Sequence, residues 1–170
     1  MLTSKQVARG FTLVEILIVV VILGILAAIV IPQFTSASES ARSSSLVTQI
    51  QTIRSQLELA QVQHQGTYPD LVADDWDVMT GETETDTAYT AGDASGNEVG
   101  PYLQQAPGNP FAADANNPTV LAADDSEAWN YNNATGMIRA VVNLTAAQAD
   151  GLGLARGVVG DTAGDVILAP

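Results

Sequence analysis

Residues 9–32 read RGFTLVEILIVVVILGILAAIVIP, and this stretch decides what kind of fold the chain can have. No side chain between Ile16 and Ile31 is polar, and the apolar run that begins at Phe11 reaches the roughly 20 residues that a membrane-spanning helix needs. Glu15 is the exception. Asp, Lys and Arg at the centre of such a helix cost roughly 2.5–3.5 kcal/mol, and Glu is expected to behave similarly. The presence of the Glu15 carboxylate in this segment therefore calls for a structural or functional explanation.

The flanks of the run predict its orientation. Lys5 and Arg9 precede it, and basic flanks of this kind stay in the cytoplasm, so the remainder of the chain is expected to be exported after a single pass. A cleavable secretory signal is the competing interpretation, with the small residues 35–38 as its cleavage site. The run is longer than the usual apolar core of about 7–15 residues, and no turn signal follows it, which argues against a signal peptide.

Beyond the run an amphipathic pattern begins. Five apolar residues, spaced four, three, four and three positions apart, share one face of a helix: Leu46, Ile50, Ile53, Leu57 and Ala60. One helix is therefore predicted from residue 11 to about residue 63, with Gly66 as its stop signal. Its length would be on the order of 80 Å. Gly24 and Pro32 are its weak points, where we expect a kink.

The remaining residues predict a small head. Residues 80–100 have little periodicity and are typical of a long exposed loop. Residues 129–132 and 137–143 form a predicted β-hairpin, and residues 166–168 a short final strand. A lone hairpin is marginal in water, so its sheet is expected to cover the apolar stripe of the helix. The predicted fold class is α+β, with a long helix, first transmembrane and then amphipathic, packed on a small antiparallel sheet.

The composition argues against several classes of function. The 170 residues carry 6 basic and 19 acidic side chains, a formal charge of −13, which would repel nucleic-acid phosphates. The chain has no cysteine, which excludes disulfides and thiolate zinc sites. His64, the single histidine, is expected at the exposed end of the helix without a positioned partner, so no catalytic constellation is visible and no enzymatic activity is expected.

Two sets of carboxylates have alternative interpretations. Thr12 and Glu15 have the spacing of a capping box, so one interpretation is that Glu15 caps the start of the helix. No cofactor is expected, except that acidic loop residues could supply oxygen ligands for calcium, the candidates being Asp114, Asp124 and Asp125. Their spacing matches no defined calcium motif, and a solvated acidic loop is the competing interpretation.

The N-terminus resembles the type IV pilin and type II secretion pseudopilin family. The residues that carry the resemblance are Gly10, the segment Phe11–Glu15, the apolar run and Pro32, within about the first third of the chain. The resemblance implies that a prepilin peptidase cleaves between Gly10 and Phe11 and that the new amine of Phe11 is methylated. It also implies that Glu15 takes part in assembly; in this second interpretation Glu15 pairs with the terminal amine at Phe11, which is ionised at neutral pH.

A second resemblance follows the helix. Residues 64–69, HQGTYP, and residues 102–111, YLQQAPGNPF, are similar to segments of the major pseudopilin branch. The acidic insert at residues 80–100 and the glycine-rich tail depart from that pattern. They leave open whether the chain builds a secretion pseudopilus, a surface pilus or a DNA-uptake fibre.

Together these observations predict four regions: a leader at residues 1–10, a transmembrane half-helix at 11–31, an amphipathic half-helix at 32–65 and a head at 66–170. The resemblance implies a filament subunit whose partners are further copies, minor pilins or pseudopilins, the peptidase and an inner-membrane assembly platform. It implies a bacterial inner-membrane protein with its head in the periplasm or outside. A signal-anchored exported domain that binds a ligand and does not polymerise is the alternative, and a secreted enzyme is a third.

Overall fold

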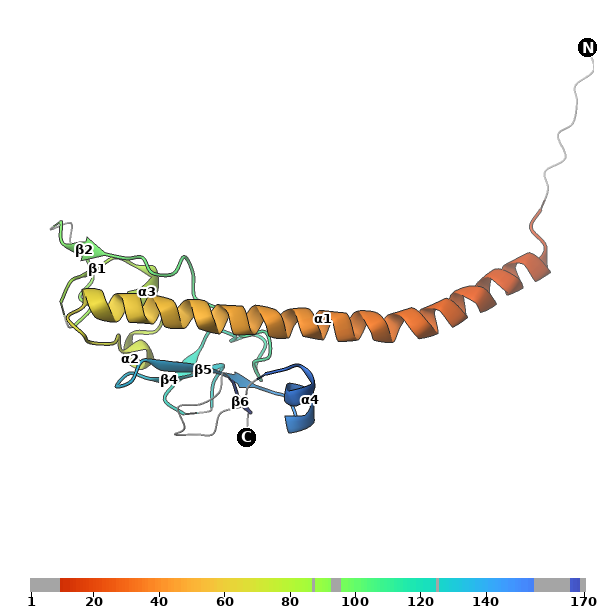
Figure 1. Cartoon of the computed structure of the whole chain (residues 1–170). Coiled ribbons are helices and arrows are strands. Elements are labelled where there is room, and N and C mark those ends of the chain that lie inside the picture. The colour runs from red at the N-terminus through yellow and green to blue at the C-terminus, as the bar shows by residue number, and fades with distance from the viewer. Residues whose placement is uncertain (1–9, 87, 93–95, 125, 155–165, 169–170) are drawn as a thin grey trace, which may run out of the picture. The chain divides into compact units, whose positions relative to one another are not determined.

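The computed structural model describes residues 10–86, 88–92, 96–124, 126–154 and 166–168 (Figure 1). The leader predicted at residues 1–10 therefore lies, except for Gly10, outside the described residues. The chain divides into two compact units, Met1–Glu39 and Ser40–Pro170, which are described in turn.

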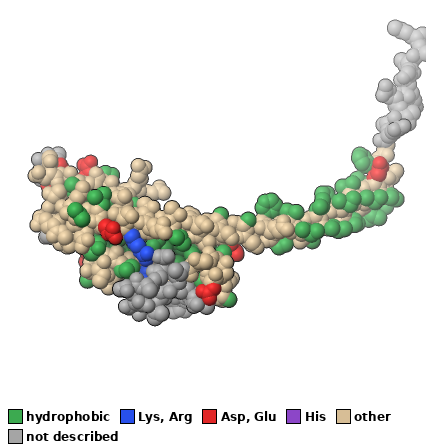
Figure 2. Space-filling view, in the orientation of Figure 1, with side chains coloured by type: hydrophobic (Ala, Val, Ile, Leu, Met, Phe, Trp, Pro, Cys, Tyr) green, Lys and Arg blue, Asp and Glu red, His purple; other side chains and the backbone are tan. Residues whose placement is uncertain are grey.

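Helix α1, Leu13–Gln63, supplies all the regular structure of the described part of the first unit. The predicted helix is confirmed to within two residues at its start. Every described side chain of the first unit is exposed, and Figure 2 shows apolar side chains along this stretch. By length and composition, α1 contains a segment able to cross a membrane. None of the residues that the structure describes covers that segment.

The helix continues through both predicted weak points, Gly24 and Pro32. Proline has no amide hydrogen, so the backbone bond from Pro32 to the carbonyl four residues earlier cannot form. Just beyond it, Thr35 Oγ1 donates to the Ile31 carbonyl at 3.2 Å, and Ser36 Oγ donates to the Pro32 carbonyl at 3.1 Å. A kink at Gly24 or Pro32 stays a prediction.

In the second unit the predicted apolar stripe of α1 is confirmed. All five residues are buried, and Ser43 extends the buried face by one turn toward the N-terminus. The stripe shares one core with buried side chains of the head, the largest of which are Trp76, Trp129 and Tyr131. The rings of Trp76 and Trp129 meet edge to face, with centroids 6.2 Å apart.

A four-stranded sheet in the order β3-β4-β5-β6 supplies the other side of this core. Its strands are β3 Leu121–Ala122, β4 Trp129–Asn132, β5 Met137–Val142 and β6 Val166–Leu168. The predicted hairpin, β4 with β5, and the predicted final strand are confirmed, as is the α+β fold class. The two outer strands pair in parallel, so the sheet is mixed rather than antiparallel throughout. Between β5 and β6 the chain forms α4, Ala146–Gly151, which opens with a capping box at Thr145.

Residues 80–100 differ from the predicted exposed loop. They follow α2, Leu71–Asp74, and α3, Asp77–Thr80, and they contain a two-stranded antiparallel sheet of β1, Thr83–Glu84, and β2, Glu98–Val99. The excursion closes on itself, since the amides of Tyr102 and Leu103 both donate to the Met79 carbonyl, at 2.9 and 2.8 Å. We call residues 80–100 the insert.

His64 is buried, which corrects its predicted place at an exposed helix end. Its ring stacks on Tyr89 with centroids 3.7 Å apart. Nδ1 lies 2.7 Å from the Asp86 carbonyl, and Nε2 lies 3.1 Å from Thr83 Oγ1. The helix ends as predicted, with left-handed backbone at Gln65 and Gly66, but the insert folds over that end and covers the imidazole.

Because the described core begins at Ser43, we expect residues 32–170 alone to form a soluble, monomeric head with one cooperative thermal transition. Leu57→Ala should destabilise this fragment by about 2–5 kcal/mol, since Leu57 is buried. Leu59, on the same helix but 45% exposed, is the matched control, and its change to alanine should cost less than about 0.5 kcal/mol. Aggregation of the fragment, or equal effects of the two substitutions, would contradict this account of the core.

We expect the stability of the fragment of residues 32–170 to fall at acid pH, because of Asp86 in the insert. The Asp86 carboxylate accepts hydrogen bonds from Thr90 Oγ1 at 2.6 Å and from the Thr90 amide at 3.1 Å. These bonds, the hydroxyl first, lower the pKa of Asp86 below its usual 3.8. A group whose pKa is lowered by folding stabilises the fold above its unfolded pKa, and this contribution is lost as the pH falls through the folded value.

We therefore expect Asp86→Ala to lower the melting temperature at pH 7, and the difference from the unsubstituted fragment to shrink as the pH falls below about 4. Thermal melts at a series of pH values measure that difference. Glu127→Ala, which removes an exposed carboxylate elsewhere, controls for the change in net charge. A difference between Asp86→Ala and the unsubstituted fragment that stays constant from pH 7 to pH 3 would contradict a stabilising role for the ionised form.

Candidate functional site

The start of α1 is a complete capping box. The Thr12 amide donates to Glu15 Oε2 at 3.0 Å, and the Glu15 amide donates to Thr12 Oγ1 at 3.2 Å. Thr12 Oγ1 also donates to Glu15 Oε2, at 2.9 Å. Backbone donors at a helix start have no partner within the helix, so this reciprocal pair fixes where α1 begins. The capping interpretation of Glu15 is thereby present in the structure, and its role in assembly stays a prediction.

Gly10 and Phe11 come just before this cap. Both lie outside the helix, and the Phe11 side chain is 80% exposed. A Cβ atom placed on Gly10 would meet no atom within 4 Å, so the fold does not require glycine here. The same is true of Gly24 within the helix. The reason for a glycine at either position therefore lies outside the contacts of the described chain.

The acidic residues proposed as calcium ligands act as caps of their own loops. Asp114 accepts from the Asn116 amide and from Asn117 Nδ2, each at 2.9 Å, and the first of these bonds is the main cause of its lowered pKa. Asp124 accepts from the Ser126 hydroxyl and amide, which lower its pKa in that order. Asp125 lies outside the described residues. The described part of the chain contains no group of three or more metal-ligating side chains, and calcium binding stays a prediction.

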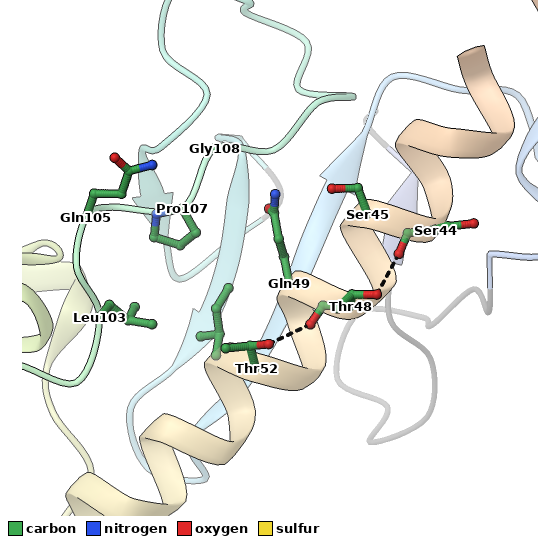
Figure 3. Close-up of a pocket in the computed structure, with 10 residues that line it drawn as sticks. Ser44, Ser45, Thr48, Gln49, Thr52, Leu103, Gln105, Pro107 and Gly108 are labelled. Carbon is green, nitrogen blue, oxygen red and sulfur yellow. Dashed lines mark hydrogen bonds between the residues drawn. The ribbon is translucent and has the colours of Figure 1, made fainter. Parts of the chain in front are cut away.

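The head also carries a groove that the sequence did not indicate. It has a volume of about 500 Å³ and lies between the second-unit part of α1 and the loop at residues 103–108 (Figure 3). Ten residues line it: Ser44, Ser45, Thr48, Gln49, Thr52, Ile53, Leu103, Gln105, Pro107 and Gly108. None of the ten carries a charge. The residues from the helix are largely its polar positions, which by themselves predict only a solvated face.

Both walls of the groove are fixed. On the helix, Thr48 and Thr52 donate their hydroxyl hydrogens to the carbonyls four residues earlier, each at 2.9 Å (Figure 3). On the loop, the Pro107 carbonyl accepts from Trp129 Nε1 at 3.0 Å. Buried Asn109 donates to the carbonyls of Ala128 and Val141 at 2.8 and 2.7 Å. These bonds tie the loop to the sheet, so the groove is preformed.

Gln49 has an unpaired atom at this groove. Its Oε1 is buried and has no hydrogen-bond partner among the described residues. Figure 3 shows its side chain extending from the helix toward the loop that carries Pro107 and Gly108. A buried acceptor without a donor costs about 1–3 kcal/mol, so an occupant with an N–H or O–H group would be favoured.

Comparison with known proteins finds similarity in the N-terminal part of the chain. Residues 5–31 match the model of the prokaryotic N-terminal methylation motif. The type IV narrow pilus major component PilA5 of Thermus thermophilus is 41% identical over 59 residues, which are 35% of this chain and 51% of that protein. Type II secretion system core protein G of Dickeya chrysanthemi is 45% identical over 51 residues, 30% of this chain and 33% of that protein.

A fimbrial protein of Pseudomonas aeruginosa is 31% identical over 84 residues, 49% of this chain and 47% of that protein. The chain thus spans between a third and about half of the length of these relatives. No solved structure matches it. The matched motif contains Gly10, Phe11 and Glu15, where the structure shows an exposed junction followed by a capped apolar helix. On this motif and these relatives, the N-terminal part of the chain is similar to that of type IV pilins and type II secretion pseudopilins.

Proposed function

We propose that this chain is a structural subunit of a filament, either a type II secretion pseudopilus or a type IV pilus-like fibre, and that it assembles through its N-terminal helix. One observation carries the proposal: an apolar helical segment long enough to span a membrane has every side chain exposed. Such a surface is stable in lipid or against other apolar helices. A subunit that passes from a membrane into a filament core meets both environments in turn.

Processing comes first in this proposal. A prepilin peptidase cleaves between Gly10 and Phe11, removes the leader at residues 1–10, and leaves the amine of Phe11 to be methylated. The support is that the junction lies before the helix and is exposed, and that the fold places no demand on Gly10. Until then Lys5 and Arg9 hold the N-terminus in the cytoplasm.

Glu15 has one role in the single subunit and another in the filament. Cleavage puts the cationic amine of Phe11 beside the helix N-terminus, where the macrodipole is also positive, and a nearby carboxylate offsets this. In a single subunit the carboxylate caps its own helix through Oε2. In a filament it pairs with the Phe11 amine of the adjacent subunit, where apolar surroundings make the attraction stronger than in water. Pairing then fixes the register between neighbouring helices.

The two weak points of the helix fit the same proposal. Gly24 has no packing partner within the described chain, and a residue without a side chain lets a neighbouring helix approach closely. Pro32 removes one backbone hydrogen bond just beyond the apolar segment, which lets the helix bend or loosen as the subunit leaves the membrane.

In this proposal residues 11–31 lie in the bacterial inner membrane and residues 32–65 form the amphipathic half of the helix. Residues 66–170 form a head outside the cytoplasm. Its partners are further copies, minor pilins or pseudopilins, the peptidase and an inner-membrane platform. It has no enzymatic role in this proposal. The groove favours one alternative, a signal-anchored exported domain that binds a ligand and does not polymerise.

Cleavage after Gly10 should leave a chain of 160 residues that begins at Phe11 and carries a methyl group on its amine. Intact-mass measurement of the protein from membranes of the native host tests this directly. Gly10→Val should accumulate with its leader attached, because a branched side chain replaces the glycine of the motif. A mature protein that begins at Met1 would favour the signal-anchored alternative, and one that begins near Ala37 would favour a secreted protein.

Glu15 substitutions separate capping from charge pairing. Glu15→Gln keeps a side-chain oxygen at the third position of the capping box but removes the charge, whereas Glu15→Ala removes both. We expect both variants to be inserted and cleaved normally and to be nearly absent from filaments, with Glu15→Asp intermediate because its side chain is shorter. The measurement is the ratio of tagged variant to tagged wild type in purified filaments. If Glu15→Gln enters filaments at the wild-type ratio, capping alone explains the residue.

A further inference from the structure

The groove between α1 and the loop at residues 103–108 lacks the charge that characterises the rest of this protein. The chain has a formal charge of −13, yet none of the ten lining residues is ionised. Two copies of so acidic a protein repel each other, and they approach most easily where both surfaces are uncharged. The groove is such a surface, and it lies on the same helix that the proposed filament packs together.

The chemistry of the groove describes its occupant. Ile53, Leu103 and Pro107 supply an apolar lining, and Gln49 Oε1 is a buried acceptor without a donor. An apolar or aromatic group therefore fits between the walls, beside an N–H or O–H group that reaches Gln49. The volume of about 500 Å³ exceeds that of a single large side chain, so part of the backbone that carries it can enter as well.

Gln33 and Phe34 together carry these two groups. The Phe34 side chain is 69% exposed, and Gln33 beside it is exposed and bears an amide donor. No charged residue lies between Ile31 and Ser38. Phe34 is also three residues beyond the predicted membrane span, so the head of another copy can reach it without entering the apolar core of the bilayer. Within its own chain, nothing described buries this ring.

We propose that the groove receives Phe34 of a second copy of the chain, with the Gln33 amide donating to Gln49 Oε1. This inference rests on the filament function proposed above. Phe34 lies 10 residues before the first groove residue, Ser44, and 19 before the last on the helix, Ile53. The contact therefore joins positions that differ by 10 to 19 residues in the sequence, so neighbouring copies must be staggered rather than in register.

The preformed walls make the contact favourable. An aromatic side chain that fills a rigid, water-excluding pocket is the usual anchor of a protein interface, and a wall that is already ordered costs no further entropy on binding. Trp129 and Asn109 hold the loop wall in place before any partner arrives. The contact would thus link the head of one subunit to the helix of another, whereas Glu15 links helix to helix.

Cysteine cross-linking tests the contact, and the chain has no cysteine of its own to interfere. One tagged copy carries Ala37→Cys, one helical turn after Phe34, and a second, differently tagged copy carries Gln105→Cys in the groove. The two are co-expressed in the native host and treated with a short bis-maleimide. Gln104→Cys is the matched control, because Gln104 is an exposed neighbour of the same type that does not line the groove.

We expect the Ala37–Gln105 pair to give a cross-linked heterodimer in filaments, at about tenfold the yield of the Ala37–Gln104 pair. Adding Phe34→Ala to the Ala37→Cys copy should reduce the yield about tenfold, as loss of an interface anchor does, and Phe34→Tyr should preserve it. Filament formation is scored separately by microscopy and by the mass of sedimented subunit.

Normal filaments with equal yields for Gln105 and Gln104 would overturn this contact and leave the filament function standing. In that case Phe34 serves only as an aromatic residue at the membrane surface. A wild-type chain that is cleaved but never polymerises would remove the filament function, and this contact with it.

Discussion

The rest of this molecule depends on one constraint, an apolar helical surface that no described residue of its own chain covers. Every described side chain up to Glu39 is exposed, and most of those between Phe11 and Ile31 are large and apolar. Water cannot be the final environment of such a surface, because the hydrophobic effect favours its removal. Lipid and neighbouring helices are the environments that remain, and the capping box of Thr12 and Glu15 fixes where this surface begins.

The two halves of α1 meet different requirements with one backbone. The first half presents apolar groups in every direction, as a segment surrounded by lipid or by other helices must. The second half hides a single stripe, from Ser43 to Ala60, beneath the sheet, and carries uncharged polar residues on the wall of the groove. The same helix therefore contains both the segment able to cross a membrane and the largest element of the described core.

Features that are local in sequence were predictable. The helix, its end near Gly66, the hairpin of β4 and β5 and the capping box at Thr12 and Glu15 all follow from periodicity, turn residues and short spacings. The short elements were not predictable, because two to four residues of β1, β2, β3, α2 or α3 carry no periodic signal. Their positions depend on contacts far along the chain, such as the Met79 carbonyl with residues 102 and 103.

The residues of the candidate site also divide into those that local sequence predicts and those that it does not. Gly10, Phe11 and Glu15 were visible because they form one contiguous motif. The burial of His64 and the groove were not visible, since they arise where segments at least 19 residues apart meet, as His64 meets Thr83. The polar residues of the helix looked like an ordinary solvated face until the loop at residues 103–108 was placed beside them.

The way the insert closes has an evolutionary consequence. Because Met79 bonds residues 102 and 103, the chain leaves the core and returns to it at one point, and everything between is an excursion. Lengthening a loop whose ends are already joined costs little, about 0.6 kcal/mol for each doubling of its length. Residues can therefore be gained or lost at the exposed positions of the insert at little cost to the sheet. Thr83, Asp86 and Tyr89 also lie within the insert, but they contact His64, so these positions are tied to the end of the helix.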